Sequence, residues 1–191
     1  TEEAMAEAWG LLDIDKMILG SILEDLVKDG LIYRSKKEKY ISMREKGFLT
    51  GTLSTNEKGF GFFKDLETRE EYFIPHKSLK DAQDRDRVLV SVLSRTSGKN
   101  REARVVKVLE RGTKSFIGEI SVVRGKIQAV PIDPRQFGTY HYQGIKARKG
   151  DRVFCEILEY PEDHKWGLAE GVSLVGNLDD ADMAIEQVII K

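Results

Sequence analysis

Cysteine, histidine and proline are scarce in this chain of 191 residues, which contains one, three and four of them. The lone Cys155 excludes an internal disulfide and is typical of a reducing compartment such as the cytoplasm. One cysteine and three dispersed histidines are too few for a structural zinc site. No apolar run reaches the roughly 20 residues that a membrane-spanning helix needs. We therefore expect a cytoplasmic protein with no membrane partner.

Motifs of the common catalytic chemistries are also missing. The sequence contains no Ser/His/Asp order, no phosphate-binding P-loop and no HExxH metal motif. Asp179, Asp180 and Asp182 form an acidic cluster near the end of the chain, but such clusters are usually solvated surface. We expect no catalytic residue, no metal and no cofactor in this chain.

The net charge of −1 conceals an uneven distribution. Residues 96–170 contain fourteen Lys and Arg against ten Asp and Glu, a balance of +4. Residues 1–46 contain eight against ten, and residues 171–191 one against four, so both ends are acidic. A basic middle can hold the phosphates of a nucleic acid, although ordinary solvated surface also carries such charge.

The first 46 residues predict a helical unit. Residues 1–12 begin with acidic side chains, which suit the amino terminus of a helix. Residues 15–30 place apolar side chains at helical spacing and end on Gly30, a typical capping residue. The predicted apolar face consists of Ile18, Ile22, Leu23, Leu26 and Val27. A hairpin with a charged tip at 35–39 follows, which is typical of a winged-helix unit, or of a helical cap with a solvated hairpin.

Short strands replace the helices from residue 47 onward. Five strand candidates in 47–111 are separated by turn residues, with one helical turn after the third strand. This order predicts a small OB-type barrel. Residues 112–178 again contain about five candidates, and 84–93 align with 148–158, which indicates an internal repeat. The fold class is therefore mainly β, with a helical amino terminus and two OB barrels, and 179–191 form a linker.

Aromatic rings concentrate in two strands of the first barrel, KGFGFF at 58–63 and YFIP at 72–75. Side chains alternate between the two faces of a strand. If Phe63 and Ile74 point into the barrel, then Phe60, Phe62 and Phe73 point outward. The alternative is that all rings belong to the core, but a small barrel cannot enclose six of them.

Lys58 shares a strand face with the outward rings by the same alternation, and His76 lies at the end of the other strand. Exposed rings beside a cation stack the bases of single-stranded nucleic acid, which contributes about 1–3 kcal/mol per base. The predicted binding residues are Lys58, Phe60, Phe62, Phe73 and His76.

The two ring-bearing motifs, together with the region 82–88, resemble the first cold-shock domain of the RNase II/RNase R family. Residues 1–46 resemble the winged helix of that family, 112–178 its second cold-shock domain, and VGNLDD at 175–180 the segment that leads into its catalytic domain. One departure is Arg85, which stands where the family usually has glycine, whereas Gly150 keeps the glycine in the second copy. A left-handed turn there would strain the arginine mildly.

The resemblance implies a 3′→5′ exoribonuclease whose catalytic aspartates hold two magnesium ions in a domain that this chain does not contain. The chain alone would then capture single-stranded RNA and feed it to that domain. The second copy has no ring-bearing motif, so RNA contact there would be mainly electrostatic, with solvated charge as an equally good explanation. The basic residues concerned are Arg124, Lys126, Arg135, Lys146 and Arg148.

Two other functions fit the residues. One is a stand-alone RNA chaperone or translation-linked regulator with tandem barrels. The other is a DNA-binding regulator that uses the winged helix, although the acidic 1–46 argue against it. The first residue, Thr1, and the apolar 188–190 near the end lead us to expect a fragment of a longer protein.

Overall fold

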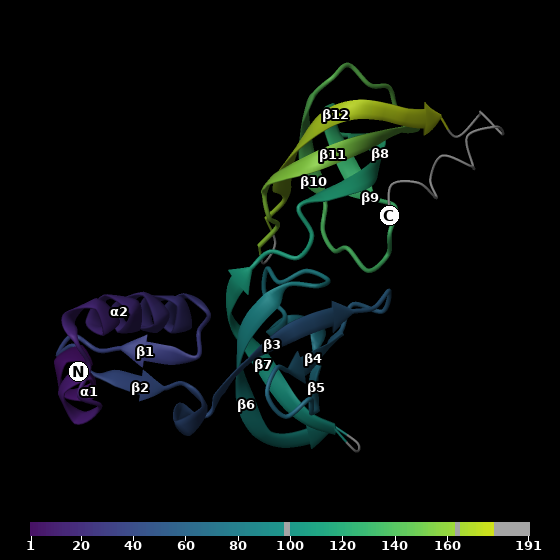
Figure 1. Ribbon diagram of the computed structural model, residues 1–191. Coiled ribbons are helices and arrows are strands. Elements are labelled where there is room, and N and C mark those ends of the chain that lie inside the picture. The colour runs from purple at the N-terminus through teal and green to yellow at the C-terminus, as the bar shows by residue number, and fades with distance from the viewer. Residues whose placement is uncertain (98–99, 163–164, 178–191) are drawn as a thin grey trace.

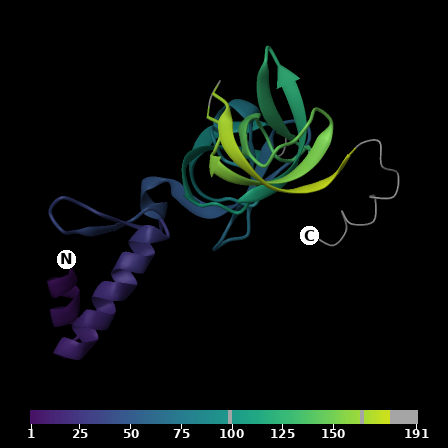
Figure 2. The same cartoon turned by 90° about the horizontal axis from the view of Figure 1, so that it is seen from above.

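The computed structural model describes residues 1–97, 100–162 and 165–177, so the predicted linker at 179–191 lies outside the described residues. Three units follow one another along the chain: a helical unit, a first β-barrel and a second β-barrel (Figure 1). The predicted fold class is confirmed, with two closed barrels of five strands each. The barrels are stacked, and the helical unit extends from one side of the stack (Figure 2). No described helix is long and apolar enough to cross a membrane.

The helical unit consists of α1 (Glu2–Ala8), α2 (Asp13–Lys28), the hairpin strands β1 (Ile32–Arg34) and β2 (Tyr40–Ser42), and the 3-10 turn η1 (Arg44–Lys46). The Thr1 hydroxyl caps α1 by accepting a hydrogen bond from the Ala4 amide at 3.3 Å. Two helices followed by a hairpin match the predicted outline of this unit.

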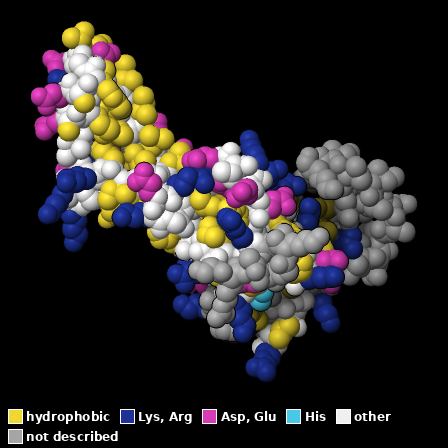
Figure 3. All heavy atoms as spheres, turned by 90° about the horizontal axis from the view of Figure 1, so that it is seen from below, with side chains coloured by type: hydrophobic (Ala, Val, Ile, Leu, Met, Phe, Trp, Pro, Cys, Tyr) yellow, Lys and Arg dark blue, Asp and Glu magenta, His cyan; other side chains and the backbone are white. Residues whose placement is uncertain are grey.

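The predicted apolar face of α2 is confirmed only in part, because of its five residues only Leu23 is fully buried. Leu19 and Leu23 are buried, and together with Ala6 they form a small core. Ile18 and Ile22 remain 55% and 50% exposed, because α1 and the hairpin cover α2 only on the side of Leu19 and Leu23. Figure 3 shows a band of hydrophobic side chains along the helical unit.

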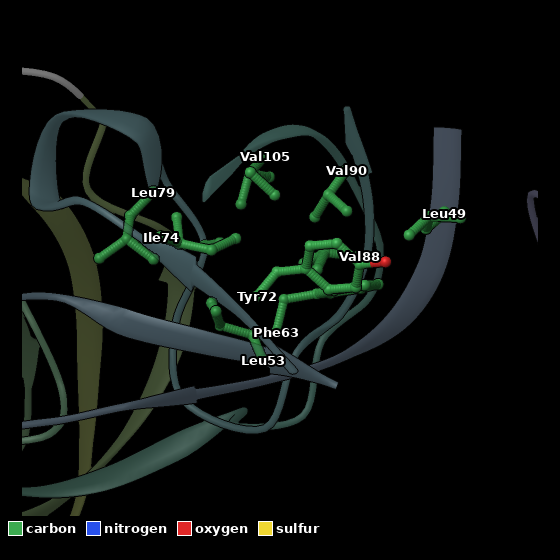
Figure 4. Packing of buried hydrophobic residues seen from close by; sticks show 11 residues of the cluster. Leu49, Leu53, Phe63, Tyr72, Ile74, Leu79, Val88, Val90 and Val105 are labelled. Atoms are coloured by element: carbon green, nitrogen blue, oxygen red, sulfur yellow. The ribbon is translucent and has the colours of Figure 1, made fainter. Parts of the chain in front are cut away.

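The first barrel contains β3 (Phe48–Thr55), β4 (Gly61–Asp65), β5 (Glu71–Ile74), β6 (Arg87–Ser97) and β7 (Asn100–Glu110), with the 3-10 turn η2 (His76–Ser78) after β5. The strands pair in the order β3-β4-β5-β7-β6 and close, and β5 runs parallel to β7. Figure 4 shows the core of this barrel, where Phe63, Tyr72 and Ile74 pack among leucines and valines. Gly51 is required beside this core, because a Cβ there would lie 2.6 Å from the Phe63 ring.

The second barrel repeats this topology. It contains β8 (Ser115–Val123), β9 (Lys126–Pro131), β10 (Tyr140–Gly144), β11 (Asp151–Glu159) and β12 (Gly167–Asn177). The order β10-β12-β11-β8-β9 closes into the same cycle, with β10 parallel to β12. The internal repeat is therefore confirmed in three dimensions. Cys155 lies in this core with no exposed surface, and burial raises the pKa of its thiol to about 11, as expected of a structural cysteine.

The turn before the fourth strand of each barrel is built alike. Arg85 has φ +66° and Gly150 has φ +92°, so the turn at Arg85 is left-handed, which is the condition under which mild strain is expected there. The Arg85 amide donates to the Leu53 carbonyl at 2.9 Å, and the Gly150 amide donates to the Ile120 carbonyl at 2.8 Å. The arginine therefore adopts a conformation that glycine adopts more readily.

Two sets of contacts hold the barrels together. Gln83 of the first barrel exchanges two hydrogen bonds with the backbone of Phe137, at 2.9 and 3.2 Å. The Thr55 hydroxyl donates to the Arg135 carbonyl at 2.6 Å. On another part of the junction, the Arg111 guanidinium lies 3.7 Å from the centre of the Tyr160 ring. The hydrogen bonds of Gln83 and Thr55 thereby fix the first barrel to the loop between β9 and β10.

Candidate nucleic-acid interface

Three phenylalanines meet beside β4 and β5: Phe62 and Phe73 lie on the outer face of the two strands, as the alternation predicted, and Phe60 immediately precedes β4. Phe62 and Phe73 are directly paired across the two strands, while their neighbours Phe63 and Tyr72 point inward. The centre of the Phe60 ring lies 5.6 Å from the centre of the Phe62 ring and 5.3 Å from that of the Phe73 ring. We call Phe60, Phe62 and Phe73 the ring platform. Each of the three rings is partly exposed, so flat apolar surface faces solvent beside the barrel.

The segment leading into β4 is a turn rather than the predicted strand. The Asn56 amide donates to the Phe60 carbonyl at 3.1 Å, and the Asn56 side chain accepts from the Lys58 amide at 3.0 Å. Lys58 therefore does not share a strand face with the platform, which corrects the prediction from alternation. Asparagine favours such a turn because its side chain bonds to the backbone two residues on. Lys58 is exposed in this turn, close in sequence to Phe60.

His76 lies at the end of β5, against the turn that precedes Phe60. Its Nδ1 is 2.8 Å from the Gly59 carbonyl, and since a carbonyl only accepts, Nδ1 carries the proton. Its ring also meets Phe137 of the second barrel edge-on, with the ring centres 6.2 Å apart. His76 therefore joins the edge of the platform to the junction between the barrels, a contact that sequence reasoning missed.

An ion pair anchors the far end of β4. Arg44 of the helical unit donates two hydrogen bonds to Asp65, at 2.7 and 2.8 Å. Burial disfavours the charge on Asp65, but the bonds from Arg44 and Thr68 outweigh it and lower the pKa of the carboxyl. The platform strand is thus held at one end by this pair and at the other by the Asn56 turn.

The five basic residues predicted in the second barrel do not form one cluster. Arg124 and Lys126 lie at the turn between β8 and β9. Lys146 and Arg148 lie in the loop after β10, at the same end of the barrel, because antiparallel neighbours place alternate loops at one end. Arg135 lies at the opposite end, beside the first barrel, and is paired with Asp133 at 2.7 Å. Only this fifth residue contacts the first barrel, through its carbonyl, which accepts a hydrogen bond from Thr55.

Metal ligands are not gathered anywhere in the described part of the chain. Among residues 1–97, 100–162 and 165–177, no group of three or more His, Cys, Asp or Glu side chains could hold an ion. The acidic residues Asp179, Asp180 and Asp182, considered from the sequence, lie outside the described residues.

The fold and the ring platform define a tandem OB-fold protein with a cluster of partly exposed rings on its first barrel. Residues 51–108 match the family model of the ribonuclease B OB domain, so the first barrel belongs to that family. The chain as a whole is homologous to ribonuclease R. It is 31% identical over 173 residues to ribonuclease R of Thermotoga maritima, which covers 89% of this chain and 24% of that protein. The chain therefore spans about a quarter of the length of this relative.

Solved structures share the fold. Ribonuclease R of Mycoplasma genitalium, in complex with ribose-methylated single-stranded RNA, superposes with a TM-score of 0.62 at 21% identity, covering 74% of this chain and 23% of that one. Yeast Ssd1, described as a pseudonuclease, superposes with a TM-score of 0.61 at 15% identity, covering 77% and 25%. At these identities the likeness establishes the architecture, and function rests on the site itself.

Proposed function

We propose that this chain is the amino-terminal RNA-binding region of a cytoplasmic 3′→5′ exoribonuclease of the ribonuclease R type. It captures single-stranded RNA on the ring platform and leads the strand toward a hydrolytic domain. Homology over most of the chain to ribonuclease R supports the type of enzyme. The neighbour solved with single-stranded RNA supports the class of ligand.

The observation that carries the proposal is the exposure of three mutually touching rings on the barrel surface. Burying apolar surface is favourable, so a folded protein that leaves a ring cluster in water usually uses it for binding. The cluster is not required to close the barrel. The second barrel closes with the same topology and has Gln128 and His141 where the first has Phe62 and Phe73.

Charges around the platform complete the proposed site. Lys58 projects from the turn before Phe60, where its ammonium neutralises a phosphate of the bound strand. His76 adds a ring at the platform edge, with its Nδ1 proton already committed to Gly59. The secondary contacts come from Arg124, Lys126, Arg135, Lys146 and Arg148, and they contribute through charge alone.

Hydrolysis belongs to the domain that the family carries beyond these barrels, where two magnesium ions would clamp the attacking and leaving oxygens. The isolated chain should bind RNA without cleaving it in the presence of magnesium. A second candidate is a protein that binds RNA through its tandem barrels as a chaperone or regulator without hydrolysis, since the described residues hold no cluster of metal ligands. Magnesium-dependent degradation of RNA by the full-length protein would decide for the nuclease.

The test is a titration of labelled oligouridine onto the wild type and a Phe60→Ala/Phe62→Ala/Phe73→Ala variant. Loss of three stacked bases at about 1–3 kcal/mol each predicts at least a roughly hundredfold weaker affinity. A matched control carries two exposed apolar side chains of β12 in the second barrel changed to alanine, Val172 and Leu174. Equal affinity of the platform variant and the wild type would refute the proposal.

A further inference from the structure

The second barrel carries rings at the place that corresponds to the platform. In the first barrel, Phe62 lies opposite Ser54 on one side and Phe73 on the other. In the second barrel, Gln128 lies opposite Ser121 on one side and His141 on the other. The inward neighbours correspond as well, because Tyr72 and Tyr140 are both buried. His141 therefore occupies the position of Phe73.

A second ring completes this position from the adjacent strand. Trp166 immediately precedes β12, and its ring centre lies 4.9 Å from that of His141 at an interplanar angle of 43°. Trp166 is 40% exposed and His141 is also exposed, so the pair presents aromatic surface to solvent. An exposed tryptophan stacked on an exposed imidazole is surface of the kind that bases bind.

The two ring sites lie on either side of the junction, where a further pair of rings meets. His76, three residues after Phe73, is the first residue of η2, just beyond the end of β5. Its ring contacts that of Phe137. Four residues after Phe137, His141 stands near the start of β10. The rings of the platform and the junction therefore lie near the end of β5, and those of the junction and the second barrel lie near the start of β10, the corresponding strand.

From this arrangement we infer that His141 and Trp166 form a second base-stacking site, which binds the same RNA strand that occupies the ring platform. The inference rests on the proposed function, since it extends the bound strand from the first barrel across His76 and Phe137. It replaces the expectation that the second barrel contacts RNA through charge alone.

Charge contributes little at this second site. The shallow groove beside Trp166, of about 370 Å³, carries Glu159 and Glu162 as well as Lys165, so it has no excess of positive charge to attract phosphate. Contact there depends on the rings, and removing them should cost the same fraction of affinity at low and at high salt.

Intrinsic fluorescence tests the site directly, because the chain has only two tryptophans, Trp9 and Trp166. In a Trp9→Phe variant, all tryptophan emission comes from Trp166, and a stacked base should quench it. We expect quenching by an oligouridine of about 12 nucleotides, and none by one of about 4, which fits on a single barrel. The matched Trp166→Phe variant, which retains Trp9 in the helical unit, should show no quenching with either length.

Affinity measurements separate this inference from the proposed function. A His141→Ala/Trp166→Ala variant should bind the longer oligouridine roughly tenfold more weakly and the shorter one unchanged. A Val172→Ala variant, altered at an exposed position of β12, is the control and should bind both like the wild type. Tight binding of the longer strand without quenching of Trp166, or equal loss for both lengths, overturns the second site and leaves the platform standing. Failure of the wild type to bind either length overturns both.

Discussion

The two barrels have one topology and two different outer surfaces. Each closes five strands in the same cyclic order around a buried tyrosine, Tyr72 or Tyr140. At the outward register positions, the paired Phe62 and Phe73 of the first barrel correspond to Gln128, which is buried, and to the exposed His141 of the second. The difference teaches that the inward residues are dictated by the fold, whereas the outward residues at the same register are free to carry function.

The largest effect should come from giving the first barrel the outer residues of the second. A Phe62→Gln/Phe73→His variant removes one of the three platform phenyl rings and replaces a second with an imidazole, while leaving the inward residues untouched. At about 1–3 kcal/mol for the stacked base that is lost, affinity for single-stranded RNA should fall at least roughly fivefold. Unchanged thermal unfolding together with unchanged RNA affinity would break the comparison, because the outer register position would then carry no function.

A smaller effect should follow at the opposite end of β4, where the barrels also differ. Asp65 lies opposite Gly51, and the corresponding residue opposite Gly118 is Pro131, which carries no charge. Asp65→Asn removes the ionic bonds from Arg44 and should lower the free energy of unfolding at neutral pH by about 2 kcal/mol. Chemical denaturation of the variant beside the wild type measures this difference.

The same substitution has a pH signature. Because the folded state lowers the pKa of Asp65 below 3.8, this carboxyl stabilises the fold above that pH, and the contribution is lost as the pH falls further. Stability of the wild type should therefore decline more steeply on acidification below 3.8 than stability of Asp65→Asn. Parallel declines would show that the Arg44 pair contributes nothing to folding.

The smallest effect concerns the shared turn, where Arg85 and Gly150 both have positive φ. Arg85→Gly relieves a left-handed conformation that costs a side-chain-bearing residue about 1–2 kcal/mol. It also raises the conformational entropy of the unfolded chain, which lowers the free energy of unfolding by roughly 0.5–1 kcal/mol. The two terms nearly cancel, so the melting temperature should rise by only a few degrees or stay unchanged. A clear loss of stability would mean that the Arg85 side chain itself supports the barrel.

Local patterns were enough to predict much of this molecule. The period of two along a strand placed Phe63 inward and Phe62 and Phe73 outward, and turn residues marked the breaks between strands. The same rule misplaced Lys58, because the side chain of Asn56 turns the backbone before β4 begins. An Asn followed by Gly three residues later was the available sign of that turn.

Contacts between distant segments could not be read from the sequence. His141 and Trp166 are 25 residues apart, and they meet because β10 pairs with β12 rather than with its successor β11. Phe137 meets His76 only after two separately closed barrels have docked. Such contacts depend on the order of the strands and on how the barrels dock. Neither produces a periodic pattern of residues in the local sequence.

The most direct test of the central claim is an NMR titration of single-stranded RNA onto the chain with its phenylalanine rings labelled. The account predicts large shifts of the ring signals of Phe60, Phe62 and Phe73, and none for Phe63 in the same barrel or Phe116 in the core of the second. Shifts that spare the platform while RNA binds would place the strand elsewhere and contradict the account.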